Sequence, residues 1–248
     1  MLSSLTLFKL LVTGHIVGGA IGLVIFWIPI VGGKGSRNHR LWGHRFINVM
    51  LLTGVLAVGI ALTTLANPTT THPHLKDHEV FKDPQMIKGI FGWMMLYLAT
   101  LTVNLAWQGK LCLRHKLNHI GNRAWHNLAI QALLVAASSS CFWHGIQLGQ
   151  PMMMGISMVG FATVATNMWF IYKPNPKPTD RIKEHIKSLV GAGISVYTAF
   201  FAFGAVRLVP ELALAPGLWA VPLVTGLTLI IYHQRAVTQR VAGGAATS

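Results

Sequence analysis

Acidic side chains are scarce in this chain of 248 residues, which has six Asp and Glu against 20 Lys and Arg. Only 10% of the residues are charged and 52% are hydrophobic, whereas roughly a quarter of the residues of a soluble domain are charged. Several apolar runs approach the roughly 20 residues that a helix needs to cross a bilayer. These proportions exclude a soluble globular domain and predict an integral membrane protein.

The few carboxylates are all expected in loops or at the ends of apolar runs. They are Asp77, Glu79, Asp83, Asp180, Glu184 and Glu211. Proton-coupled transporters usually relay protons through carboxylates that lie inside the membrane. The distribution therefore argues against that class.

Cysteine is also scarce. Cys112 falls in a predicted loop, and Cys141 falls near the far end of the next predicted span. The two thiols are expected on opposite sides of the membrane, too far apart for a disulfide.

The apolar runs predict an all-α fold in which a single transmembrane domain occupies residues 1–248. Seven spans are expected, near 5–31, 44–66, 87–108, 123–146, 152–172, 186–208 and 213–234. The first run is longer than the apolar core of a signal peptide, and no Ala-x-Ala cleavage site follows it. It is therefore expected to remain as a span.

Positive charge alternates between successive loops. The first, third and fifth loops and the tail carry most of it, at Lys34, Arg37, Arg40, Lys110, Arg114, Lys116, Arg123, Lys173, Lys177, Arg181, Lys183, Lys187, Arg235 and Arg240. By the positive-inside rule the amino terminus lies outside and the carboxyl terminus inside. Topology thus accounts for the formal charge of +14, and nucleic acid is not expected as a partner.

A weak repeat is visible in the first six spans. In each pair of spans a Trp ends the first, a His opens the second, and an Arg precedes the His. The residues are Trp27, Arg40 and His44, then Trp107, Arg123 and His126, then Trp169, Arg181 and His185. The pattern predicts three related hairpins followed by a seventh span, although Trp and Arg also favour membrane interfaces for other reasons.

His15 is expected near the middle of the membrane, roughly 15 Å along the first span. Gly14, Gly18 and Gly22 form a small-residue face beside it, which lets a helix or a flat ligand approach closely. An ionisable group at this depth is a candidate functional residue. The alternative is a neutral His that forms a hydrogen bond across a helix interface.

His126 and His144 are 18 residues apart on the fourth span, so they share one helix face at two depths roughly 27 Å apart. Two stacked b haems need such a pair, each iron taking a second imidazole from a neighbouring helix. The inner partner would be His44 or His185, and the outer partner would be His15. Arginines near the membrane surfaces could bind the propionates: Arg40, Arg45, Arg123 and Arg181 inside, and Arg207 outside. The alternative is that both histidines only cap helix ends.

Two zinc sites are weaker alternatives. His44, His126 and His185 could hold zinc with a water molecule, although no carboxylate base accompanies them. In the second predicted loop, His72, His74 and His78 have a spacing that could bind copper or zinc, but such loops are more often simply solvated.

The stretch around the first loop resembles an uncharacterised bacterial family of multi-pass membrane proteins, a domain of unknown function. The resemblance rests on a His in the first span followed by Lys-Gly, His-Arg and Gly before the second, here His15, Lys34, Gly35, His39, Arg40 and Gly43. It covers about the first sixty residues and implies location and fold but no reaction. His39 and Arg40 could bind an anionic group, such as a lipid phosphate, a haem propionate or a quinone carbonyl.

These patterns favour a membrane redox protein that binds haem b or quinone between its helices and transfers electrons. The expected location is a bacterial inner membrane, with lipids and redox proteins as partners. The first alternative is a non-catalytic accessory subunit of a larger membrane complex. The second is a His-ligated zinc hydrolase.

Overall fold

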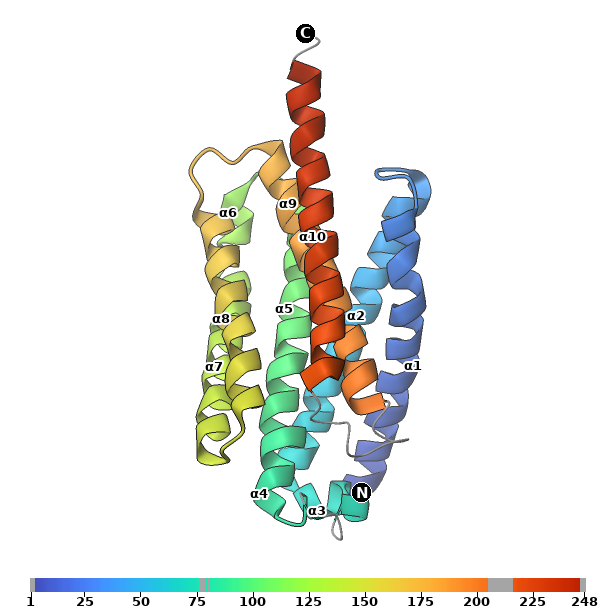
Figure 1. The fold of residues 1–248 in the computed structure, drawn as a ribbon, viewed down its shortest axis with the longest axis vertical. Coiled ribbons are helices and arrows are strands. Elements are labelled where there is room, and N and C mark those ends of the chain that lie inside the picture. The colour runs from blue at the N-terminus through green and yellow to red at the C-terminus, as the bar shows by residue number, and fades with distance from the viewer. Residues whose placement is uncertain (1–2, 76–78, 80, 205–215, 246–248) are drawn as a thin grey trace.

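The computed structural model describes residues 3–75, 79, 81–204 and 216–245, and every regular element among them is a helix (Figure 1). The long helices are α1 (Ser4–Val31), α2 (Arg37–Ala66), α5 (Met95–Arg114), α7 (Trp125–Gln147), α8 (Pro151–Tyr172), α9 (Pro178–Ala199) and α10 (Pro216–Ala245). The short elements are α3 (Pro68–Thr71), η1 (Pro73–Leu75), α4 (Pro84–Ile87), α6 (His119–Asn122) and two π-helical segments, η2 (Lys88–Met94) and η3 (Phe200–Gly204).

Seven of these helical segments are long and apolar enough to cross a membrane. This confirms the all-α class and the seven predicted spans within the part of the chain that the structure describes. The third span is a continuous helical run through α4, η2 and α5, and the sixth joins α9 to η3.

The helices α2, α5, α9 and α10 extend several residues beyond the predicted spans, and local signals at the first residues of α2 and α9 mark where these two begin. Ser36 caps α2 by accepting a hydrogen bond from the backbone N–H of His39, so α2 begins before residue 44. Pro178 occupies the first turn of α9, where a missing N–H costs nothing, so α9 begins before residue 186. α5 continues to Arg114, and the prediction that Cys112 lies in a loop was wrong.

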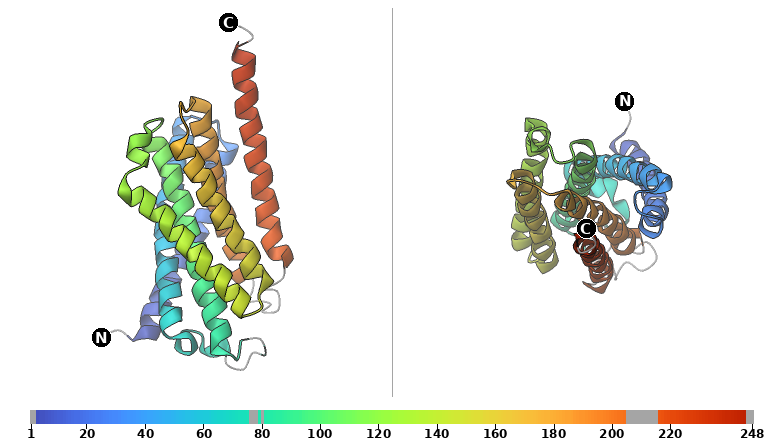
Figure 2. Two further views of the ribbon diagram at one scale, coloured as in Figure 1. Left: turned by 90° about the vertical axis from the view of Figure 1, so that its left-hand side faces the viewer. Right: turned by 90° about the horizontal axis from the view of Figure 1, so that it is seen from above.

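The helices form an elongated bundle with α5 at its centre (Figure 2). α5 packs against α2, α7 and α9, while α1 packs mainly on α2, and α8 on α7. The pair α7 and α8 therefore lies on the opposite flank from α1 (Figure 1). α10 rests on α9 and extends past the other helices.

The two ends of the bundle differ in charge. The α1–α2, α5–α7 and α8–α9 connections lie together with the carboxyl-terminal part of α10 (Figure 1), and we call this the basic end. The amino terminus, α3, α4 and the α7–α8 connection lie at the opposite end.

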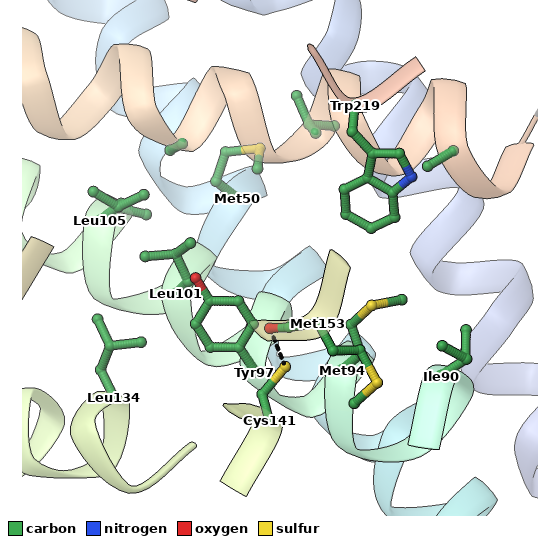
Figure 3. Packing of buried hydrophobic residues seen from close by; sticks show 14 of the residues in the cluster. Met50, Ile90, Met94, Tyr97, Leu101, Leu105, Leu134, Cys141, Met153 and Trp219 are labelled. Carbon is green, nitrogen blue, oxygen red and sulfur yellow. Dashed lines mark hydrogen bonds between the residues drawn. The ribbon is translucent and has the colours of Figure 1, made fainter. Parts of the chain in front are cut away.

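Apolar side chains pack through the middle of the bundle (Figure 3), and the core cluster continues toward both of its ends. Tyr97, Met94 and Met153 are almost completely buried there, and the thiol of Cys141 lies 3.6 Å from the carbonyl oxygen of Met153. Gly160 brings α8 close to its neighbours, because a Cβ at this position would overlap the Ser138 hydroxyl and approach the Tyr97 ring within 2.7 Å. Both cysteines are free and buried.

Candidate functional site

His15 forms a hydrogen bond across the α1–α2 interface. Its Nδ1 lies 3.1 Å from the backbone carbonyl oxygen of Thr53. Because a carbonyl only accepts, this ring nitrogen carries the proton. The glycine face of α1 makes the close approach possible, since a Cβ on Gly18 would overlap the Thr53 hydroxyl. This is the packing role that was the alternative to a ligand role for His15.

The basic motif of the first loop folds back on the end of α1. Lys34 donates to the carbonyl oxygens of Pro29 and Ile30, and His39 Nδ1 lies 3.0 Å from the same Pro29 oxygen. Arg40 donates to the carbonyl oxygen of Gly35 at 2.8 Å. Partial burial, and then the nearby Arg240, lower the pKa of Lys34 below its usual value.

Gly35 completes this turn with a φ of +79°, which glycine adopts without strain. The carbonyls at the end of a helix otherwise lack partners. The Lys-Gly and His-Arg pairs of the motif therefore act as a helix cap, and this use needs no bound anion.

The histidines that were predicted on the inner side fall into two separate groups. His185 lies on α9 with Nδ1 3.5 Å from the Gly109 carbonyl oxygen, and His39 and His44 lie within electrostatic range of it. His126 is exposed on α7, on the other side of the bundle. The structure therefore does not bring His126 together with His44 or His185.

The two histidines predicted as an outer pair, His15 and His144, are separated as well. His144 stacks on Trp93, with ring centroids 4.7 Å apart and planes inclined by 13°. His15 lies on α1, on the opposite flank from α7 (Figure 1). Two of the arginines proposed for propionates are already engaged by protein, since Arg40 binds Gly35 and Arg123 donates to the Ile171 carbonyl oxygen. Arg207 lies outside the described residues.

The histidines of the second loop have different environments. His72 is buried, 8% exposed, between the rings of Phe8 and Phe91. Burial, and to a smaller extent the neighbouring His74, lower the pKa of His72 to about 4. The His72 and His74 ring centroids are 6.0 Å apart, and His78 lies outside the described residues. Within the described parts of the chain, no three His, Cys, Asp or Glu side chains form a group that could hold a metal ion.

A set of polar side chains that the sequence analysis did not single out meets between α5, α7, α8 and α9. We call it the polar cluster, and it consists of Asn104, Gln108, Gln131, Asn167, Glu184 and Lys187. All but Lys187 are buried, and the Lys187 side chain is 21% exposed.

Lys187 is the hub of this cluster. Its Nζ lies 2.9 Å from Glu184 Oε2 and donates at 2.9 Å to Asn167 Oδ1 and to Thr166 Oγ1. The three protons of the ammonium group therefore each have an acceptor.

The cluster continues from the hub in two directions. Gln108 Nε2 donates to the other Glu184 oxygen at 3.1 Å. Asn167 Nδ2 donates to Asn104 Oδ1 at 2.9 Å and to Gln131 Oε1 at 3.2 Å. An unbroken chain of polar contacts thus joins four helices inside an apolar bundle.

Glu184 was predicted at the end of an apolar run, and the structure shows in addition that its side chain is buried inside the bundle. It is the seventh residue of α9, and it is 7% exposed. The cluster lies roughly 8–15 Å from the ends of its helices at the basic end, at 1.5 Å per residue. The argument against proton-coupled transport therefore no longer holds.

Two polar atoms beside the cluster have no hydrogen-bond partner among the described residues: Gln108 Oε1 and Ser188 Oγ. Both side chains are almost completely buried. An unsatisfied buried polar atom costs about 1–3 kcal/mol. Such a cost is tolerated most readily at a site that exchanges water or a ligand.

A cavity of about 160 Å³ leads to the cluster from the basic end. Residues of α8, α9, α10 and the α8–α9 connection line it, and Glu184 and Lys187 are among them. Gln234 of α10 also lines it and donates to the Lys183 carbonyl oxygen at 3.1 Å.

A second, almost entirely apolar cavity of about 430 Å³ lies between α2, α5 and α7. Val55, Leu96, Val103 and Leu133 are among the residues that line it. Trp93, which stacks on His144, belongs to its wall. The cavity also borders the run of small residues at Ala136, Ala137 and Ser140.

The chain was compared with protein-family models, with curated proteins and with solved structures, and none of them matches it. The resemblance of the first sixty residues to an uncharacterised family therefore stays a prediction, and the site has to be interpreted from its own geometry.

Proposed function

We propose that this protein is a membrane carrier that binds a small polar solute at the polar cluster and moves it across the bilayer. The ion pair of Lys187 with Glu184, held inside the bundle by amide side chains, is the observation that carries the proposal. Ionisable groups inside a transmembrane bundle mark ion or substrate pathways in most cases, because placing them there is costly.

A purely structural role explains the cluster less well. Replacing a buried ion pair by apolar residues of similar volume is often neutral or stabilising, so packing alone gives no reason to keep these charges. The unpaired Gln108 Oε1 and Ser188 Oγ add to the cost. A solute that exchanges hydrogen bonds with these groups supplies the reason.

The two halves of the bundle support a carrier rather than a channel. The cavity reaches the cluster from the basic end, while Met94, Tyr97 and Met153 pack the half toward the opposite end. A carrier exposes its site to one side of the membrane at a time.

The finer topology belongs to the same proposal. By the positive-inside rule the basic end faces the cytoplasm and the amino terminus faces outward. The location that fits this arrangement is a bacterial inner membrane, with lipids as neighbours. The threefold hairpin repeat of the first six spans is proposed on its sequence pattern alone.

Accessibility of Thr166 from both sides of the membrane tests the carrier proposal without knowledge of the solute. Thr166 lines the cavity and accepts a hydrogen bond from Lys187. Thr166→Cys would be made in a Cys112→Ala, Cys141→Ala background. It would be treated with a membrane-impermeant thiol reagent in right-side-out and inside-out vesicles.

We expect labelling from both sides, faster from the basic end. The matched control is Ser138→Cys, since Ser138 is buried and lies outside the cluster, and it should be labelled from neither side. Labelling of Thr166→Cys from one side only, or from neither, would contradict the carrier proposal.

Electron transfer with a quinone or haem b is the second candidate. The observation that favours it is the Trp93–His144 stack at the wall of the apolar cavity. A prenyl tail suits the apolar lining, and the imidazole of His144 suits a quinone carbonyl. A reduced-minus-oxidised spectrum and quinone extraction of the purified protein test this candidate. Haem b bands, or a quinone that is lost in His144→Leu, would favour it over the carrier.

A further inference from the structure

The cavity at the basic end holds more positive than negative side chains. Its charged lining consists of Lys173, Asp180, Lys183, Glu184 and Lys187. We infer that it binds a small anionic group of one negative charge, the phosphate or carboxylate type, at Lys183. The inference rests on the proposed function, since it names the class of solute that enters toward the polar cluster.

Two of the three lysines that line the cavity form ion pairs within it, and the third, Lys183, does not. Lys173 pairs with Asp180 at 3.0 Å, and Lys187 pairs with Glu184 at 2.9 Å. The Lys183 ammonium has no ion-pair or hydrogen-bond partner among the described residues. The lining therefore carries a net charge of +1, which one monovalent anion neutralises.

The position of Lys183 is fixed from two sides. It lies on α9 within one turn of Glu184 and Lys187, and its carbonyl oxygen accepts the hydrogen bond from Gln234 of α10. Trp169 and Phe170 of α8 supply an aromatic wall. An anion at Lys183 would thus lie above the Glu184–Lys187 pair, where the Lys187 ammonium also attracts it.

The volume limits the size of the anionic group. Water occupies roughly 30 Å³ per molecule in the liquid, so 160 Å³ corresponds to about five water molecules. Formate or dihydrogen phosphate fits this space, and a nucleotide does not. The same chemistry has two sources, a free anion in solution or the phosphate of a lipid headgroup at the membrane surface.

Thermal unfolding of the full-length protein in a neutral detergent tests the inference. Formate, and dihydrogen phosphate at pH 6, would be titrated at constant ionic strength against gluconate, a bulkier monovalent anion. In a separate arm, phosphatidylglycerol would be compared with phosphatidylcholine in mixed micelles. Binding to the folded state raises the midpoint of unfolding by mass action.

We expect a saturable rise in the midpoint with at least one of these probes. In Lys183→Met the apparent Kd should increase by about tenfold or more. Lys183→Arg keeps the positive charge and should keep the response, which would show that substitution at this position does not prevent folding. Arg235→Met, which removes a neighbouring charge outside the cavity, should behave like the unmodified chain.

The outcomes separate the alternatives. A Lys183-dependent response to formate or dihydrogen phosphate identifies a free anion, and a response to phosphatidylglycerol alone identifies a lipid headgroup. No response to any probe, or the same response in Lys183→Met, would overturn the inference. The thiol labelling of Thr166→Cys reports on the carrier independently. If an anion binds but Thr166→Cys is labelled from one side only, the anion site is supported and the carrier proposal is contradicted. If no anion binds but Thr166→Cys is labelled from both sides, the carrier proposal is supported and its solute is of another class.

Discussion

The ammonium nitrogen of Lys187 lies 2.9 Å from a carboxylate oxygen of Glu184, three residues earlier on α9, and both side chains point into the bundle. The remaining polar contacts of the two groups are amides and a hydroxyl. Each charge therefore depends on the other for its solvation.

Removing one member of this pair should destabilise the protein more than removing both. Lys187→Met leaves the Glu184 carboxylate buried without a cation, which we expect to cost about 3 kcal/mol. The double variant Glu184→Gln, Lys187→Met should recover part of this loss. Thermal unfolding followed by a thiol-reactive dye measures it, because Cys112 and Cys141 are buried in the folded state.

The control for this pair is Lys173→Met. Lys173 is 33% exposed in its pair with Asp180, and a partly exposed ion pair contributes about 1 kcal/mol or less. If Lys187→Met unfolds at the same temperature as Lys173→Met, the ion pair with Lys187 is not what stabilises the buried Glu184 carboxylate.

Two glycines of α8 should respond in opposite directions to alanine. Gly160→Ala places a methyl group against Ser138 and Tyr97, and overpacking of this kind costs about 1–3 kcal/mol. Gly155→Ala meets nothing within 4 Å and should gain up to about 1 kcal/mol from helix propensity. The same dye assay compares them, and a stable Gly160→Ala would show that α8 can move away from α5 and α7.

Acid should destabilise the packing of the α2–α4 connection through His72. Its folded-state pKa is about 4, below the value of 6.5 for a free imidazole. The unfolded state therefore takes up a proton first, and stability present above pH 6.5 is lost as the pH falls toward 4. Between pH 7 and pH 5 this amounts to about 2 kcal/mol.

Unfolding temperatures at several pH values, for the unmodified chain and for His72→Phe, measure the effect of His72. We expect a flatter pH profile in His72→Phe. His74→Gln serves as the control, since His74 is exposed. Its unfolding temperature should fall with pH as steeply as that of the unmodified chain. Equal slopes in the unmodified chain and His72→Phe would assign the acid sensitivity to other groups.

The hydrogen bonds that cap the end of α1 should contribute more to the stability of the fold than the positive charge of the following loop. Lys34→Met removes the donor to the Pro29 and Ile30 carbonyls and should cost about 1 kcal/mol. Arg37→Met removes one charge at an exposed position and should leave the unfolding temperature unchanged. Equal effects of the two substitutions would mean that loop charge, not the cap, is responsible.

The number and approximate place of the helices could be predicted because hydropathy measures the transfer of a long apolar segment into lipid. The same measure misplaced the start of α9. Its first turns carry Asp180, Lys183, Glu184 and Lys187, which count against a span. Glu184 and Lys187 pair within the helix, and Asp180 pairs with Lys173 of the α8–α9 connection, which no window of hydropathy records.

The polar cluster was missed for a related reason. Asn104 and Gln108 are four residues apart on α5, so they share a face, and this spacing was the available signal. Their partners Gln131, Asn167 and Glu184 are distant in sequence and unremarkable one at a time. The histidines were predicted as ligands because imidazole commonly binds metals and haem. In the structure, His15 and His39 instead form hydrogen bonds with backbone carbonyl oxygens.

The apolar packing around Tyr97 and Met153 has an electrical consequence. For the carrier that we propose, the membrane potential would fall mainly across the region that excludes water, which in this proposal is the half toward the opposite end. A charge that enters from the basic end and stops at Lys187 crosses little of the field. One that passes Tyr97 experiences most of it, up to about 2.3 kcal/mol per 100 mV for an elementary charge. Voltage would therefore act on the opening of this half far more than on the filling of the site.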